Sequence, residues 1–479
     1  MRSLYHESCQ SREEAKNKLR TQATPADCQS GGASEETEIA EKMGIEQMLI
    51  ISASHGAGWL FDAHAGVMRA KEASGVTHAA TETDVLIIGG GFVGLTLACG
   101  LADSAITSVV VEAGDPRRAL ARSFDGRASA IALTSRRLLN SIGVWSKLAG
   151  EAAPMLDIRV SEGSSRLFLH YDHREVGDEP FGHMLENQAL RRALLERVGE
   201  LPAVGLLAPA ATATLERREE GVEARLSDGT EIRAALVVAA DGRGSQVRDE
   251  AGIRVTRWAY PQSAIVTTVE HERSHHFVAH EHFLPEGPFA ILPLLPETRS
   301  SIVWTERADL ALAILGLDDD AFAVQLGRRF GDFLGDVRPV GRRFCYPLSL
   351  QYAAAARGRR LALVGDALHA MHPIAGQGLN MGFRDVAALI DVVADEAAAG
   401  RDPGSAAALA RYERWRRFDN MLMLATTDAL NRLFSNDFPP LRLARDIGLA
   451  AVNRMPPLKR FFVRHAMGTM GDLPRRMRG

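Results

Sequence analysis

The residues best suited to chemistry form a glycine-rich segment from His372 to Asp385, which reads HPIAGQGLNMGFRD. Three glycines, Gly376, Gly378 and Gly382, would let the backbone approach a ligand closely. The segment follows the strand-like run LALVGD and opens a helical pattern, so backbone N–H groups at a helix N-terminus would face the ligand. We therefore expect a flat, electron-rich ligand at this turn.

A second glycine-rich turn has the spacing GxGxxG. Gly89 would make a tight turn, Gly91 would let a pyrophosphate approach the backbone, and Gly94 would let a helix pack on its strand. Glu112 lies 18 residues after Gly94, at the end of the next strand-like run. A carboxylate at that place accepts hydrogen bonds from ribose hydroxyls, so the pattern predicts a dinucleotide site.

Two further strand-like runs end in an aspartate beside a glycine. Asp241 follows LVVAA within ADGRGSQVRDEAG, and Asp366 follows LALVG within VGDALHAMHP. A carboxylate at a strand end can hold cofactor hydroxyls, although each turn alone is equally an ordinary connection from a strand to a helix.

A β-α-β unit would position the first of these motifs. The apolar run from Thr83, the glycine turn, a helical pattern to Ser104 and the run TSVVVEAG give the unit in order. A helical stretch, 187–198, then precedes ATATLERREE, VEARLSDGTEI and LVVAADG, which we expect to form a small antiparallel meander beside the nucleotide unit. A β-rich region follows over 256–344, and helical patterns cover 384–400 and 406–430.

The expected organisation is an α/β fold with a Rossmann-type nucleotide-binding domain, an inserted β-sheet and C-terminal helices. The discontinuous nucleotide-binding domain would take residues 81–160, 182–255 and 345–400. A β-rich substrate domain would take 161–181 and 256–344, and a basic helical segment 401–479. Residues 1–80 lack periodicity and are expected to be a disordered extension, with Met68 as an alternative start.

Composition limits the class of protein. The 479 residues are 46% hydrophobic and 24% charged, and 56 basic against 60 acidic residues argue against a nucleic-acid-binding protein. The four cysteines lack metal-site spacing, which predicts free thiols in a reducing compartment. Without a secretory pattern or a run of about 18 apolar residues, we expect a cytoplasmic protein, with a peripheral position at the inner face of the plasma membrane left open.

Together, the three turns resemble the fingerprints of the single-component, para-hydroxybenzoate-hydroxylase-like FAD-dependent aromatic hydroxylases. HPIAGQGLNMGFRD, FLPEGPFAILPL and SIVW narrow the resemblance to the ubiquinone-biosynthesis hydroxylase family of FAD-dependent aromatic monooxygenases. YERWRRFDN and the following TDALNRLFSND are similar to its 2-octaprenyl-6-methoxyphenol hydroxylase branch. The resemblance extends from residue 83 to the C-terminus.

This resemblance implies an enzyme that hydroxylates the ring of a polyprenylated phenol through a flavin hydroperoxide. FAD would be the cofactor, O2 a substrate, and NADPH or NADH a transient co-substrate, because no second GxGxxG motif is present. The segment Arg243-Gly244-Ser245 departs from the family's frequent Ala-Asp-Ser and leaves the nicotinamide contact open. The FAD-binding residues that the resemblance implies are Gly89, Gly91, Gly94, Glu112, Arg127, Asp241 and Asp366.

Within the glycine-rich segment, the backbone N–H groups of Gly378, Leu379 and Asn380 are expected to stabilise the negative charge of a reduced flavin. The expected catalytic positions are Pro373, His372 and Gly376. Pro373 and the loop after it would flank the isoalloxazine. His372 would assist phenol deprotonation or, in the simpler alternative, cap the loop.

Two clusters have competing interpretations. One holds five histidines without helical spacing or partner carboxylates, for which we predict a solvated strand face and no metal (His271, His275, His276, His280 and His282). The other is the basic, partly apolar region from Leu441 to the C-terminus. It fits contact with an anionic membrane or a partner protein, and equally a helical cap on the flavin domain.

Other functions on the same fold stay open. A flavin halogenase would carry a WxWxIP motif, which this chain lacks, and an amine oxidase would not end its third fingerprint in HPIAGQG. A prenyl reductase and a hydroxylase of another ring position are further alternatives. A non-catalytic flavoprotein subunit in a complex with other ubiquinone-biosynthesis proteins is the non-enzymatic one.

Overall fold

A computed structural model gives the fold of residues 59–62, 67–70, 80–121, 127–162, 168–371, 376–434 and 455–479. An eight-stranded sheet carries the nucleotide motifs, in the order β10-β4-β3-β13-β12-β11, with β20 and β19 attached at β13. Its strands are β3 (Thr81–Ile88), β4 (Ser108–Val111), β10 (Val204–Leu207), β11 (Thr212–Arg217), β12 (Val222–Leu226), β13 (Glu231–Ala239), β19 (Arg357–Gly358) and β20 (Leu361–Leu363).

The expected meander is part of this sheet and does not pack beside it. The nine-residue strand β13 pairs antiparallel with β12 at its start and runs parallel between β3 and β20 at its end. Its last four residues are buried, as expected for a strand covered on both faces. One long strand therefore continues the meander into the parallel sheet.

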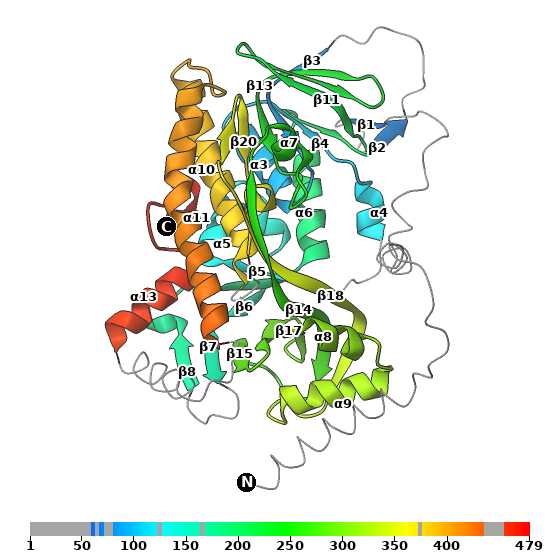
Figure 1. Cartoon of the computed structure of the whole chain (residues 1–479), viewed down its shortest axis with the longest axis vertical. Helices are drawn as coiled ribbons and strands as arrows, with labels where there is room; N and C mark the ends of the chain where they lie inside the picture. The colour runs from blue at the N-terminus through cyan, green and yellow to red at the C-terminus, as the bar shows by residue number, and fades with distance from the viewer. Residues whose placement is uncertain are drawn as a thin grey trace, which may run out of the picture. The chain divides into compact units, whose positions relative to one another are not determined.

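Helices pack on this sheet and on one another. α10 (Gly378–Ala398) contacts α3 (Phe92–Ala102) and α11 (Ala406–Phe434), which lies along it in Figure 1. α10 begins directly after the glycine turn, before the expected start at residue 384, because Leu379, Asn380 and Met381 continue its helical pattern. The remaining helices here are α4 (Pro116–Ala121), α5 (Leu133–Ser141), α6 (Asn187–Gly199) and α7 (Gln246–Glu250).

A second eight-stranded sheet has the order β21-β18-β14-β17-β16-β15-β7-β8. One face packs against α8 (Ala308–Leu315) and α9 (Asp319–Phe330) around Trp304 and Phe322. Side chains alternate between the two faces along each strand, so the strand residues next to Trp304 point to the face away from α8 and α9. The strands are β7 (Asp157–Glu162), β8 (Phe168–Asp172), β14 (Val255–His271), β15 (Val278–Leu284), β16 (Gly287–Leu294), β17 (Arg299–Arg307), β18 (Val337–Ala353) and β21 (His369–Ala370).

Smaller elements complete the described part. A three-stranded sheet joins β5 (Ala128–Ala132), β9 (Gly182–Glu186) and β6 (Ala153–Met155), and α13 (Pro456–Ala466) precedes the C-terminal tail. Within the expected extension, β1 (Trp59–Asp62) and β2 (Val67–Ala70) pair antiparallel. The other residues before Ala80 lie outside the described part.

Candidate cofactor and substrate site

The GxGxxG turn leaves no room for side chains at two of its glycines. Gly89 has a positive φ of 109°, and a Cβ there would lie 2.3 Å from the carbonyl oxygen of Ala240. A Cβ on Gly94 would lie 2.0 Å from the carbonyl oxygen of Gly89. Gly91 differs, since no atom lies within 4 Å of its Cβ position, and it lines a cavity.

Glu112 holds the first turn at the end of β4. Its Oε2 accepts a hydrogen bond from the backbone N–H of Gly90 at 2.7 Å, and its Oε1 accepts one from the N–H of Gly114 at 2.6 Å. These bonds fix the carboxylate beside the start of α3. α3 has no side-chain cap at Gly91, so an anion can approach its first N–H groups.

The second turn, after β13, contains an unsatisfied carboxylate oxygen. Asp241 Oδ2 accepts from the N–H of Val247 at 3.3 Å, whereas its buried Oδ1 has no hydrogen-bond partner among the described residues. Arg248 is fully buried and donates to the carbonyl oxygens of Arg243 and Ala367, both at 3.1 Å. It therefore ties the second turn to the third.

Asp366 lies in the third turn, directly after β20. Its side chain is open to the cavity but surrounded by protein, and this burial raises the pKa of its carboxyl above the ordinary value, against the opposing charges of Arg243 and His369.

A buried charge network supports this turn, and the sequence analysis did not identify it. Asp385 of α10 accepts from the N–H of Gly365 at 3.2 Å and from Arg416 Nε of α11 at 2.8 Å, and it lies 2.6 Å from His369 Nε2. The side chains of Asp385 and Arg416 are almost fully buried. Burial alone would raise the pKa of Asp385, but His369 and Arg416 outweigh it and lower that pKa.

The glycine-rich turn meets β5 through Asn380. Its Oδ1 accepts from the N–H of Ala132 at 2.9 Å, and its Nδ2 donates to the carbonyl oxygens of Ala130 at 2.9 Å and Gly376 at 3.2 Å. Gly376 has a positive φ of 62°. The side chain of Asn380 thus braces the turn from which α10 starts.

Gly378 and Leu379 line the cavity, and α10 has no side-chain cap at Gln377. His372 and Pro373 lie outside the described residues.

One cavity of about 1170 Å³ joins these turns to the second sheet. One end is formed by Gly91, Asp366 and the start of α10, and the other by the free face of the sheet with the ends of α11 and α13. That second region is mostly apolar, and the residues that line it include Ile158, Leu169, Phe283, Leu292, Phe434 and Val463. Thus the cavity has polar backbone and carboxylate groups at one end and an apolar region at the other.

Arg127 lies apart from this arrangement, whereas His280 of the histidine cluster is among the residues that line the cavity. The Arg127 guanidinium stands over the Phe344 ring at 5.3 Å, and Arg127 is not among the residues that line the cavity.

The prediction of a solvated histidine face is wrong for His271, His275 and His280, which are buried. The rings of His271 and His275 lie within hydrogen-bond distance of backbone carbonyl oxygens, and burial lowers the pKa of all three. Among the residues that the structure describes, no three His, Cys, Asp or Glu side chains form a metal-binding group.

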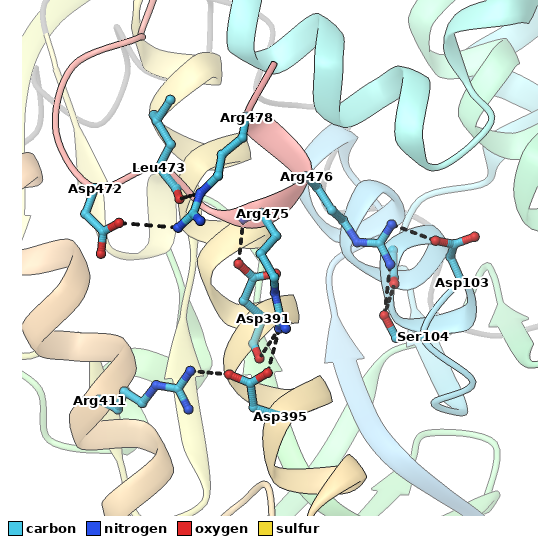
Figure 2. A network of polar contacts seen from close by, with 11 residues as sticks. Asp103, Ser104, Asp391, Asp395, Arg411, Asp472, Leu473, Arg475, Arg476 and Arg478 are labelled. Atoms are coloured by element: carbon cyan, nitrogen blue, oxygen red, sulfur yellow. Dashed lines mark hydrogen bonds and ion pairs between the residues drawn. The ribbon is translucent and has the colours of Figure 1, made fainter.

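The C-terminal tail, which follows α13, is bound to α10 and to the residue after α3 (Figure 2). Arg475 donates to Asp391 Oδ2 through its backbone N–H at 2.8 Å and to Asp395 Oδ1 through Nη2 at 2.7 Å, and both carboxylates belong to α10. Arg476 Nη1 donates to Asp103 Oδ2 at 2.6 Å, just after α3. These basic residues of the tail are therefore paired within the chain.

Comparison with known proteins identifies the family. A family model described as an FAD binding domain matches residues 82–424. "Ubiquinone hydroxylase UbiL" of Rhodospirillum rubrum is 58% identical over 399 residues, which is 83% of this chain and 92% of that protein. The 3-demethoxyubiquinol 3-hydroxylase of Escherichia coli is 36% identical over 81% of this chain and 98% of that protein.

More distant proteins agree. The mouse mitochondrial ubiquinone biosynthesis monooxygenase COQ6 is 33% identical over 83% of this chain and 93% of that protein. The crystal structure of p-nitrophenol 4-monooxygenase from Pseudomonas putida superposes with a TM-score of 0.68 at 21% identity, covering 81% of this chain and 99% of that one, which shows a common fold. The predicted α/β fold with a Rossmann-type FAD-binding part is confirmed. The chain belongs to the ubiquinone hydroxylase family of FAD-dependent monooxygenases.

Proposed function

We propose that this chain hydroxylates the aromatic ring of a polyprenylated phenol in ubiquinone biosynthesis, with NADPH or NADH and O2 as co-substrates. The observation that carries the proposal is the single continuous cavity. Its volume of about 1170 Å³ exceeds the roughly 300–1,000 Å³ of ordinary ligand pockets, so it has room for a cofactor ring and a substrate. An apolar region next to the polar turns suits a phenol with a long apolar tail.

The turns fit FAD. The open space at Gly91 and the uncapped starts of α3 and α10 suit phosphates and an electron-rich ring, and the unpaired Asp241 Oδ1 suits a hydroxyl donor. We assign the ADP half to Gly89, Gly91, Gly94 and Glu112, and the ribityl chain to Asp366. When bound, FAD would accept hydride from the nicotinamide and activate O2.

The remaining assignments follow from the family. Arg127 and Asp241 would contact the cofactor, and the N–H groups of Gly378, Leu379 and Asn380 would stabilise its reduced form. Pro373, His372 and Gly376 would flank the reacting ring. The corresponding division of the chain takes residues 81–160, 182–255 and 345–400 as the FAD-binding part, 161–181 and 256–344 as the substrate part, and 401–479 as the helical segment.

For the ring position, we propose a 2-octaprenyl-6-methoxyphenol as substrate, because YERWRRFDN and the residues after it are similar to that branch. A second candidate is a demethoxyubiquinol, the substrate class in the name of the E. coli relative. The test uses purified, FAD-loaded protein and short-chain analogues of both substrates. NAD(P)H oxidation, O2 uptake and the mass of the product are measured for each.

A product heavier by one oxygen atom from the methoxyphenol supports the first substrate, and its ring position can be read by NMR. Turnover of the demethoxyubiquinol alone would favour the second. Bound FAD without stimulation by either compound would contradict the hydroxylase proposal and favour a non-catalytic subunit.

We also propose a membrane-facing surface on α11 and α13. Phe418, Met421 and Leu422 form an exposed apolar strip on α11, and Phe462 of α13 is exposed as well. Exposed Arg417 lies next to the strip on α11, which suits anionic lipid headgroups. Among the described residues, no helix is long and apolar enough to cross a membrane, so the contact would be peripheral.

Co-sedimentation with anionic vesicles tests this surface. We expect weaker binding after Phe418→Ser with Met421→Ser, while FAD content stays at the native level. Unchanged sedimentation would contradict the proposal. Point variants are preferable to a deletion of the C-terminal region, because such a deletion would remove the cavity wall on α13.

A further inference from the structure

One carboxylate interrupts the apolar wall of the cavity. Ala279, Glu281 and Phe283 share one face of β15, and all three line the cavity. In the register of the sheet, Glu281 lies between Val160 of β7 and Ala290 of β16, which also line it. The short side chain of Ala290 leaves the carboxylate open to the cavity. Glu281 is therefore the polar member of an otherwise apolar row on this strand.

No hydrogen bond or ion pair joins the Glu281 carboxylate to another described side chain. The elements that pack against β15 supply three other titratable groups: Tyr171 of β8, which lines the cavity, and Lys459 of α13 and Glu162 of β7, which do not. Glu162 is buried and lies opposite Phe283 in the register of the sheet. Burial raises the pKa of Tyr171 above its ordinary value, so it stays neutral. Lys459 Nζ lies 2.6 Å from Glu175, which already neutralises it.

Among the residues that the structure describes, the other neighbours of β15 give Glu281 no positively charged partner. The end of α11 contributes Phe434, which stacks on Phe283 with ring centroids 4.1 Å apart. Arg159, which alternates with Val160 on β7, points to the opposite face of the sheet. An unpaired carboxyl in such a wall is costly unless a ligand completes its hydrogen bonds.

Burial in this wall raises the pKa of Glu281 to about 7. A carboxyl with that pKa is partly ionised at neutral pH and can both accept and release a proton, as a general base must.

We propose that Glu281 accepts the hydroxyl hydrogen bond of the bound phenol and serves as its general base. This inference rests on the proposed function. The proton moves from the phenol oxygen to a carboxylate oxygen of Glu281, and the electron pair of the broken O–H bond stays on the phenolate. The ring then carries more electron density for attack on the oxygen atom that O2 and NAD(P)H supply in the proposed hydroxylation. Glu281 returns the proton to solvent or product afterwards.

The test compares native protein with Glu281→Gln and Glu281→Leu, and uses exposed Glu231→Gln as the matched control. Dissociation constants are measured by flavin absorbance for a short-chain 2-prenyl-6-methoxyphenol and for its O-methyl ether, which lacks the donor. Single-turnover hydroxylation is measured from pH 5.5 to 8.5, and FAD content reports folding. A hydrogen bond to a charged acceptor predicts that native protein prefers the phenol by about 10- to 100-fold.

In native protein we expect the hydroxylation rate to rise with pH through about 7, following Glu281. Both variants should lose this rise, and Glu281→Leu should also lose the preference for the phenol over its ether. FAD-loaded Glu281→Leu with native discrimination and a native pH profile would overturn this inference alone. Absence of phenol-stimulated turnover in native protein would overturn the proposed function, and this inference with it.

Discussion

Neutralising Asp385 tests how the third turn is held. In Asp385→Asn the Arg416 guanidinium, 1% exposed, would lose its buried counter-charge and keep only the more exposed carboxylate of Asp419, 2.7 Å away. Two unit charges about 4 Å apart attract by roughly 4 kcal/mol at an effective dielectric constant of about 20. Removal of one partner of a buried pair costs about 3–5 kcal/mol. We therefore expect the free energy of unfolding to fall by about 3–5 kcal/mol.

The loss of the Asp385 charge should also affect cofactor binding. Asp385 Oδ2 also holds the N–H of Gly365, next to Asp366. We expect Asp385→Asn to bind FAD more weakly at temperatures where the protein remains folded. The assay is urea unfolding followed by tryptophan fluorescence, combined with titration of the apoprotein with FAD. Exposed ion pairs provide the control, because Arg218→Gln, which breaks only the surface contacts with Glu216 and Glu223, should leave the unfolding midpoint unchanged.

A double variant separates the charge effect from packing. Asp385→Asn with Arg416→Met removes both charges, so it should be less destabilised than the sum of the two single variants, with a coupling of about 1–3 kcal/mol. The reasoning is refuted if Asp385→Asn loses less than about 1 kcal/mol or if the two single losses simply add.

Three further predictions follow from the same geometry. The pKa of Asp385 in the folded protein lies below its ordinary value of 3.8. Its contribution to stability should therefore be complete above pH 3.8 and be lost as the pH falls through the folded pKa. In Asp385→Asn, the free energy of unfolding should depend less on pH in this acid range. Gly94→Ala should unfold the turn, since its Cβ would lie 2.0 Å from a carbonyl oxygen, whereas Gly91→Ala should fold with a native circular dichroism spectrum and lose FAD. Asp391→Asn, which weakens the contact with Arg475, should speed proteolysis after residue 455 and weaken substrate binding at native FAD content.

The local motifs could be predicted because their chemistry lies within a few residues. A strand, a tight turn and a helix fix Gly89, Gly91 and Gly94, and Glu112 ends the next strand. The continuous sheet over β11, β12 and β13 could not be predicted from the alternation of its strands, because sheet membership depends on pairing between β13 and distant β3 and β20.

Two features of the site escaped the sequence analysis for a different reason. Glu281 lies among histidines in the sequence, so the sequence indicates that it faces solvent. Only the structure shows that it lines the cavity. A signal existed, since it shares the strand phase of apolar Ala279 and Phe283. Arg416 reads as one of several surface arginines, although Tyr412 and Asn420, four residues away on each side, indicate a common buried helix face.

The two sheets are joined by a pair of very long strands. β14 continues from the second turn into the second sheet, and β18 returns from it toward β20; each has 17 residues, and they pair with each other along most of their length, with irregularities after Ala259 and Val266. A hydrogen-bonded ribbon of this kind is mechanically stiff, so a hinge between the sheets would have to break its ladder. Substrates and products must therefore enter and leave the cavity by displacement of loops, of the ends of α11 and α13, or of the cofactor itself. Spin labels on the two sheets should accordingly report one narrow distance distribution with and without substrate.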